Sequence, residues 1–166
     1  MRRTWLVLAI AACTRGELAS DEAARRADAA GDSTFAAVQD RGAVVMGVDQ
    51  YTSTHHFTDL PDGGMIELQR DSVDPAGIAQ IRAHMQQIAT AFAAGDFTLP
   101  GMVHAQVVPG TGTMAARRSV ISYAAVELPN GAQVRITTTD SVALKAVHEF
   151  LAFQRQDHHA GMRHDD

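Results

Sequence analysis

Apolar residues recur at three- and four-residue steps in two stretches of the chain, which is the spacing of one face of an α-helix. The first stretch covers residues 75–94 and is followed by Gly95, and the second covers residues 141–157. An aspartate, Asp74 or Asp140, stands directly before each stretch, where its side chain can accept hydrogen bonds from free amides of a first turn. The pattern predicts two amphipathic helices, each with one apolar stripe that must be covered.

Four shorter segments alternate apolar and polar residues and have the spacing of strands. They form two pairs, and each pair is joined by a short run in which Pro is followed by Asp-Gly or Asn-Gly. Proline presets φ at the first turn position, and glycine supplies the positive φ of a tight turn. We therefore expect two β-hairpins, with strands at residues 51–58, 65–70, 120–127 and 133–138 and turns at residues 60–64 and 128–132.

The order strand, strand, helix occurs twice along the chain. Because each helix needs a surface to cover its stripe, this order predicts an α+β two-layer sandwich. We expect an antiparallel sheet of about four strands with two helices on one face, pseudo-repeated as ββα-ββα. Residues 43–46 have the composition of a further strand that opens the domain. Residues 97–118 contain prolines and several glycines, so we expect a long loop there.

The N-terminus has the pattern of an export signal. Arg2 and Arg3 precede a short apolar run, and Ala11 and Ala12 stand directly before Cys13, the one cysteine of the chain. The run is too short to span a bilayer. A cysteine after small residues resembles a bacterial lipobox, in which the thiol receives a diacylglyceryl group and becomes the mature N-terminus. The alternatives are a structural cysteine in a first helix, or an ordinary signal in which the cysteine is accidental.

These features predict the order of segments along the chain. We expect a signal peptide at residues 1–12, a lipidated N-terminus with a flexible tether at residues 13–42, one α+β domain at residues 43–159 and a frayed tail at residues 160–166. The tether segment has few large apolar residues, so it cannot bury enough surface to hold a fixed position. The expected location is beyond the cytoplasm: exported, lipid-anchored, and periplasm-facing or at the outer membrane.

Composition excludes several classes of function. The chain has 14 basic and 19 acidic residues, a formal net charge of -5 and no basic stripe, so nucleic acid is not an expected partner. It contains no G-x-S-x-G sequence, no P-loop and no dinucleotide fingerprint. A single cysteine cannot form an internal disulfide, so packing must stabilise the domain.

Histidine is abundant, at eight of 166 residues, and its placement suggests a site. His55 and His56 are neighbours in an expected strand, so their side chains point to opposite faces and only one can join a given site. His84 and His148 lie at the border of the buried stripe of the two helices, and in a pseudo-symmetric domain we expect them to approach each other. The candidate metal ligands are His55, His56, His84, His104, His148 and His158.

The histidines allow two interpretations. Neutral imidazole suits copper, zinc, iron and nickel, Met102 or Met114 would favour copper, and haem is the other candidate group. In the structural interpretation, the histidines at helix borders bond to backbone carbonyls or carboxylates, and His158, His159 and His164 are solvated. No compact metal signature such as H-E-x-x-H or C-x-x-C is present to decide between them.

Several short strings resemble those of a family of small exported bacterial proteins or lipoproteins that have no assigned activity. They are Thr-His-His-Phe at residues 54–57, His-x-Phe-Leu-x-Phe-Gln at residues 148–154, and the stretches at residues 46–50, 81–85 and 157–158. The resemblance covers about residues 42–159. It implies that the residues to test first are His55, His56, His84, His148 and His158.

The sequence therefore favours a non-catalytic envelope lipoprotein that binds a transition metal, copper before others, or haem through its histidines. In this hypothesis His84 and His148 are the central ligands, and the membrane is contacted through the N-terminal lipid. One alternative is an interaction lipoprotein without metal, which docks a sheet edge or a helix face onto an envelope protein. Another is a small metal-dependent enzyme in which Asp49, Glu149 or Asp157 supplies acid-base chemistry.

Overall fold

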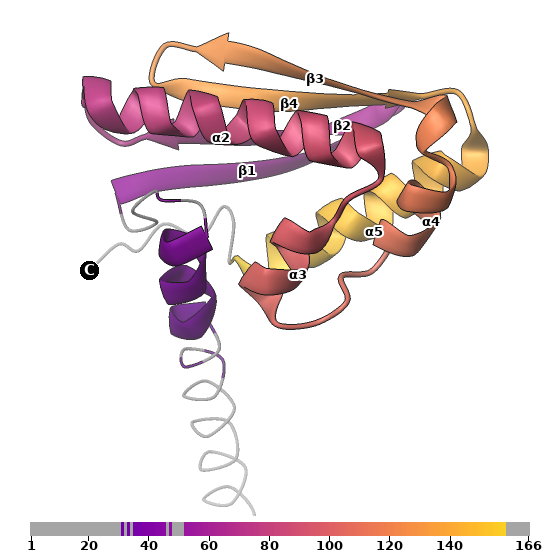
Figure 1. The fold of residues 1–166 in the computed structure, drawn as a ribbon, viewed down its shortest axis with the longest axis horizontal. Helices are drawn as coiled ribbons and strands as arrows, with labels where there is room; N and C mark the ends of the chain where they lie inside the picture. Colours follow the sequence, from indigo (N-terminus) through magenta and orange to yellow (C-terminus); the bar gives the residue numbers. More distant parts are fainter. Residues whose placement is uncertain (1–30, 32, 34, 46, 48–51, 159–166) are drawn as a thin grey trace, which may run out of the picture. The chain divides into compact units, whose positions relative to one another are not determined.

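A computed structural model describes residues 31, 33, 35–45, 47 and 52–158 (Figure 1). The chain divides into the units Met1–Thr34 and Phe35–Asp166, and every element discussed below belongs to the second unit. The expected signal peptide, the lipidation site Cys13, Asp49, His159, His164 and the tail at residues 160–166 lie outside the described residues.

Four strands form one antiparallel sheet, as the alternating segments predict. They are β1 (Ser53–Leu60), β2 (Gly63–Arg70), β3 (Ile121–Leu128) and β4 (Gly131–Thr138). Their order across the sheet is β1-β2-β4-β3, so the two hairpins meet along their second strands. Pro61 and Asp62 turn the first hairpin, and Pro129 and Asn130 turn the second, which confirms the positions of both turns. The expected positive φ is present at Gly63 (+146°) but not at Gly131.

Two long helices cover one face of this sheet (Figure 1). Helix α2 (Pro75–Ala94) follows the first hairpin but packs mainly over β3 and β4, whereas α5 (Ser141–Asp157) follows the second hairpin and packs mainly over β1 and β2. The α+β two-layer class is therefore confirmed, without an exact internal repeat being established. Among the described residues, no helix is long and apolar enough to cross a lipid bilayer.

The sheet is apolar under the helices and polar on its open face. Phe57, Ile66 and Val134 lie side by side on three neighbouring strands and are at most 7% exposed. His56 and Glu67, one residue along from Phe57 and Ile66, lie on the open face and are exposed or half-buried. The largest fully buried side chains of the core include Phe92, Phe150, Leu68, Ile81, Met85, Met114, Ile136 and Leu151.

The ends of the two long helices follow the signals in the sequence. The Asp140 carboxylate accepts hydrogen bonds from the backbone N–H groups of Val142 (3.0 Å) and Ala143 (2.8 Å), which fixes the start of α5. Gly95 has a φ of +81°, and its N–H donates to the Phe92 carbonyl (2.9 Å), which ends α2. Both predicted helices have the expected bounds, but the expected cap at Asp74 is absent, since its side chain accepts no hydrogen bond from the first turn of α2.

The prediction of a long loop at residues 97–118 is wrong. The segment contains α3 (Thr98–His104), α4 (Thr111–Ala116) and the beginning of a 3₁₀ turn, η2 (Arg118–Val120). Proline is tolerated in the first turn of a helix, where Pro100 stands. Burial stabilises these short helices despite their weak local propensity, and their buried residues are Pro100, Val103, His104, Thr111 and Met114.

A helix also lies before the expected start of the domain. Residues 35–45 are helical, so this part is neither a flexible tether up to residue 42 nor the beginning of a strand at residue 43. Val38 is 1% exposed, and Nε of Arg41 donates to the Val103 carbonyl of α3 (2.6 Å). Contacts with distant residues stabilise this helix, an effect that local composition does not show.

The glycines that begin β2 and β4 provide a test of the strand register. A Cβ on Gly63 would overlap the Ile136 carbonyl, and a Cβ on Gly131 would overlap the Leu68 carbonyl, because the two inner strands approach closely there. A Cβ on Gly112 of α4 would meet nothing within 4 Å. We expect Gly63→Ala and Gly131→Ala each to lower the free energy of unfolding by about 2–3 kcal/mol.

Gly112→Ala is the matched control, and it should leave that free energy unchanged or raise it, since alanine favours helix. Urea denaturation followed by circular dichroism measures all three variants. Wild-type stability in Gly131→Ala would contradict the pairing of β2 with β4.

Candidate functional site

The sheet, α2, α3 and the C-terminal end of α5 line a small cavity of about 50 Å³. Most of its wall is apolar, formed in large part by core side chains that include Phe57, Leu68, Met85, Phe92 and Phe150. Its polar lining is four imidazoles and one amide, from His55, His84, His104, His158 and Gln154. We call this site the histidine cavity.

Each histidine reaches the cavity from a different element. Strand alternation turns the side chain of His55 on β1 toward the helices, in line with Leu68 of β2. His84 lies on the buried stripe of α2, His104 is the last residue of α3, and His158 directly follows α5. The cavity therefore brings together four of the six predicted ligands.

Burial keeps the imidazoles of His55 and His84 neutral. Loss of hydration lowers the pKa of His55 from 6.5 to about 3, with smaller contributions from the positive charges that His84 and His56 would carry. Loss of hydration also lowers the pKa of His84 from 6.5 to about 4. At neutral pH each ring thus has one nitrogen lone pair that can accept a hydrogen bond or bind a metal ion.

His84 has a buried ring nitrogen without a hydrogen-bond partner. The residue is 5% exposed, and no donor or acceptor among the described residues reaches its Nε2. Such an atom costs stability, on the order of 1–3 kcal/mol, and buried polar atoms in proteins are generally satisfied. Because His84 lines the cavity, a molecule bound there could supply the missing partner.

His104 is held by the end of α5. Its Nδ1 contacts the carboxylate of Asp157, and its Nε2 lies 2.9 Å from Oε1 of Gln154. Its ring also lies edge-on to Phe153, with 5.0 Å between the ring centroids. Both ring nitrogens are engaged, so His104 joins the last turn of α3 to the last turn of α5.

His158 is packed among other rings. Its ring centroid lies 5.1 Å from that of His55, 5.0 Å from that of His104 and 5.5 Å from that of Phe57. The residue is 9% exposed, so the expectation that His158 is solvated is wrong. The reason is that α5 ends against β1 and α3, which enclose the residue that follows it.

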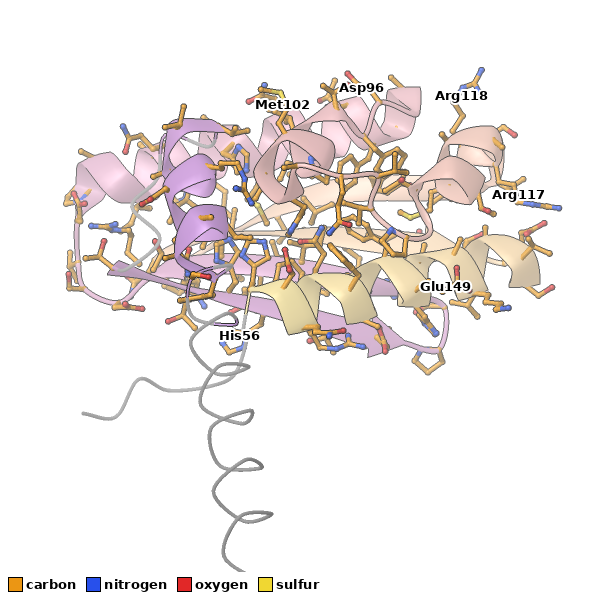
Figure 2. The ribbon with its side chains drawn as sticks, turned by 90° about the horizontal axis from the view of Figure 1, so that it is seen from below. His56, Asp96, Met102, Arg117, Arg118 and Glu149 are labelled. Atoms are coloured by element: carbon orange, nitrogen blue, oxygen red, sulfur yellow. The ribbon has the colours of Figure 1, made fainter. Side chains whose placement is uncertain are left out.

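His148 and His56 do not join the cavity. Nε2 of His148 lies 3.0 Å from the Leu60 carbonyl and 2.9 Å from the Gly63 carbonyl, so its N–H donates to the turn of the first hairpin. His84 instead lies near His55, toward the other end of β1, and the expectation that His84 and His148 approach each other is not met. His56 is exposed on the open face, at the edge of the molecule away from Met102 in Figure 2.

Met102 and Met114, the two methionines that would favour copper, also lie outside the histidine cavity. Met102 is 53% exposed and points outward (Figure 2), and Met114 is buried in the core without lining the cavity. The methionine in the cavity wall is Met85. In the part of the chain that the structure describes, no three His, Cys, Asp or Glu side chains are grouped so that they could hold a metal ion.

The carboxylates proposed for acid-base chemistry are separated. Asp157 contacts His104 at the cavity, whereas Glu149 forms an ion pair with Lys145 (3.7 Å) and does not line it. Gln154 is the cavity residue that sequence reasoning missed. Its position three residues after Leu151 and four after Phe150, on the buried stripe of α5, is the signal that could have revealed it.

Comparison with known proteins finds no matching family model, no matching curated protein and no matching solved structure.

The acid stability of the metal-free protein tests the neutral histidines. Unfolded histidine has the ordinary pKa of 6.5, and the folded pKa values of His55 and His84 are lower, so stability is present above pH 6.5 and is lost as pH falls toward 4 for His84 and toward 3 for His55. Between pH 7 and pH 5, the lowered pKa of His84 alone should reduce the free energy of unfolding by on the order of 2 kcal/mol. Urea denaturation at the two pH values measures it.

His84→Gln removes that titration and should reduce the loss between pH 7 and pH 5. His56→Gln is the control, because His56 is exposed on the open face and should leave the loss as it is in the wild type. An undiminished loss in His84→Gln would mean that His84 is not kept neutral by burial.

Proposed function

We propose that this domain is a non-catalytic binding protein whose histidine cavity takes one small, neutral, largely apolar molecule with a single hydrogen-bonding group. The observation that carries the proposal is the buried Nε2 of His84, which lacks a partner among the described residues at a largely apolar cavity. A concave, mostly apolar pocket with few polar groups is the usual form of a small-molecule site. In this proposal the apolar wall binds the body of the ligand, and His84 binds its polar group.

The lining of the cavity favours a neutral ligand over an organic acid or an amine. A charged group would lose its hydration on entering, at a cost that only a well-placed opposite charge offsets. His55 and His84 are uncharged at neutral pH, and the carboxylate of Asp157 is already bonded to His104. These residues therefore offer no free charge to a ligand.

Phenol, toluene and benzoate test the proposal, because they share a ring and differ in their polar group. We expect phenol to bind most tightly, since its hydroxyl can partner His84, and benzoate most weakly, since it loses hydration. At a phenol concentration ten times its Kd, the free energy of unfolding should rise by about 1.4 kcal/mol. Thermal unfolding of the protein with each compound measures this, and an absence of stabilisation by all three would contradict the proposal.

His84→Leu identifies the polar partner. The change removes the ring nitrogens and keeps an apolar side chain, so toluene should still bind while the preference for phenol over toluene disappears. His56→Gln is the matched control and should behave as the wild type, because His56 lies on the other face of the sheet. If His84→Leu keeps the wild-type preference for phenol, His84 is not the partner.

A single transition-metal ion, copper before others, is the second candidate ligand. It is favoured by the neutral imidazoles of His55 and His84, which line the same small cavity as the thioether of Met85. Imidazole and thioether together suit copper in its reduced form. A haem is far larger than the 50 Å³ cavity and ranks behind an ion. A three-ligand site would require the histidines to move closer together, since no such group is present among the described residues.

Elemental analysis of protein purified without chelator or affinity tag, followed by Cu⁺ titration, tests the metal. We expect one equivalent in the wild type, none in the double variant His55→Gln, His84→Gln, and one in the control His56→Gln, His148→Gln, which removes the two predicted ligands outside the cavity. Equal uptake by both double variants would exclude the cavity as the site, and no uptake by the wild type would exclude copper.

We also propose that the protein is exported and lipid-anchored through Cys13, facing the periplasm or at the outer membrane. The support is the sequence pattern of Arg2, Arg3, a short apolar run and small residues before Cys13. In a bacterial host, Cys13→Ser should abolish incorporation of labelled palmitate and release the protein from the membrane fraction. Equal labelling of the variant and the wild type would contradict the anchor.

A further inference from the structure

Helix α3 forms the outer wall of the histidine cavity. Leu99, Pro100, Val103 and His104 all line the cavity, and all four belong to this short helix. Much of the remaining wall consists of side chains of the main hydrophobic core, on the sheet, α2 and α5, and none of the four α3 residues belongs to that core. The cavity therefore has one wall made largely of packed core side chains, and another wall, α3, whose residues lie outside that core.

Three residues beside α3 have a positive φ. Gly95 before the helix has a φ of +81°, and Ala105 and Gly110 after it have φ values of +53° and +80°. Gly95 and Gly110 adopt positive φ readily and are held there, since the Gly95 N–H donates to the Phe92 carbonyl and Gly110 lies against the Ala146 carbonyl of α5. Alanine is strained in the left-handed region, and a movement of α3 that returns Ala105 to negative φ would relieve that strain.

Side-chain hydrogen bonds attach α3 to α5 and to the helix at residues 35–45. His104 contacts Asp157 and Gln154 of α5, and Arg41 donates to the Val103 carbonyl (2.6 Å). Of β1–β4, α2, α4 and α5, none packs extensively against α3. Removing the bonds of His104 would therefore loosen the C-terminal end of α3, which the Arg41 bond would still hold, while leaving the core intact.

The cavity is too small for the ligand class that its lining favours. A cavity of about 150 Å³ is known to bind benzene, whereas the volume here is about 50 Å³. On the packed side, Phe92 and Phe150 are each 1% exposed and meet edge to face, with 5.7 Å between their centroids. The wall that contains Phe92 and Phe150 cannot move without disrupting the core, so the wall that moves is α3.

We propose that α3 is a hinged wall that opens the histidine cavity, and that the bonds of His104 to Asp157 and Gln154 are the clasp that keeps it closed. The role of this motion in ligand entry rests on the proposed function, but the motion itself is a property of the protein alone. The wall turns at Ala105, while Phe97 before α3 and Val108 after it stay packed against the core. Opening exposes His84 and enlarges the cavity toward the size of a ring.

Hydrogen exchange followed by mass spectrometry measures the opening in the full chain without any ligand. We expect the amides of α3 to exchange at least about a hundredfold faster than those in the middle of α2, because α3 opens without global unfolding. Asp157→Ala and Gln154→Ala each remove part of the clasp and should raise exchange in α3 about tenfold further, leaving α2 unchanged. Glu149→Gln is the matched control on the same helix, since Glu149 pairs with Lys145 and does not line the cavity.

Two results would overturn the hinged wall. One is equal protection of α3 and α2 in the wild type, and the other is a parallel rise in both helices in both clasp variants, because opening would then be global unfolding. Phenol distinguishes this inference from the proposed function. Fast exchange in α3 that phenol does not change would support the hinged wall and contradict the proposed ligand class. Slower exchange in α3 in the presence of phenol would support both the hinged wall and the ligand class.

Discussion

The contact between Phe92 of α2 and Phe150 of α5 is the interaction on which the rest of the structure depends. The two rings meet edge to face over the sheet, and Phe97, which leads into α3, lies 4.4 Å from Phe92 between centroids. Each helix covers the hairpin of the other half, so this contact joins both halves at the centre of the core. Such aromatic pairs add about 0.5–1.5 kcal/mol to the stability that area burial provides. The same two rings form the inner wall of the histidine cavity.

The histidines that line the cavity differ in their hydrogen bonding and in their effect on stability. Burial holds His55 and His84 in the neutral form, and Nε2 of His84 is left without a partner among the described residues, both of which lower the stability of the empty protein. His104 is different, because Asp157 and Gln154 engage both of its ring nitrogens. The histidines are therefore divided between one that fastens the wall and others that face the space behind it. This division is the structural basis for a binding function.

Local signals predict most of the fold, and long-range contacts determine the site. Helices α2 and α5 have the expected bounds because their stripes and end residues are local features, and the strands shift by no more than one or two residues. Helix α3 and the helix at residues 35–45 escape prediction, because contacts such as Arg41 with the Val103 carbonyl stabilise them. The expected meeting of His84 with His148 fails because each helix crosses to the opposite hairpin, which residue spacing does not reveal.

The central claim is that a largely apolar space lies against a buried, neutral His84. A crystal structure of the protein under xenon pressure tests it most directly, since xenon enters apolar cavities that contain no ordered water. The account predicts one xenon atom enclosed by His84, Met85 and Phe92. Absence of xenon from this position, with ordered water bonded to Nε2 of His84 instead, would contradict it.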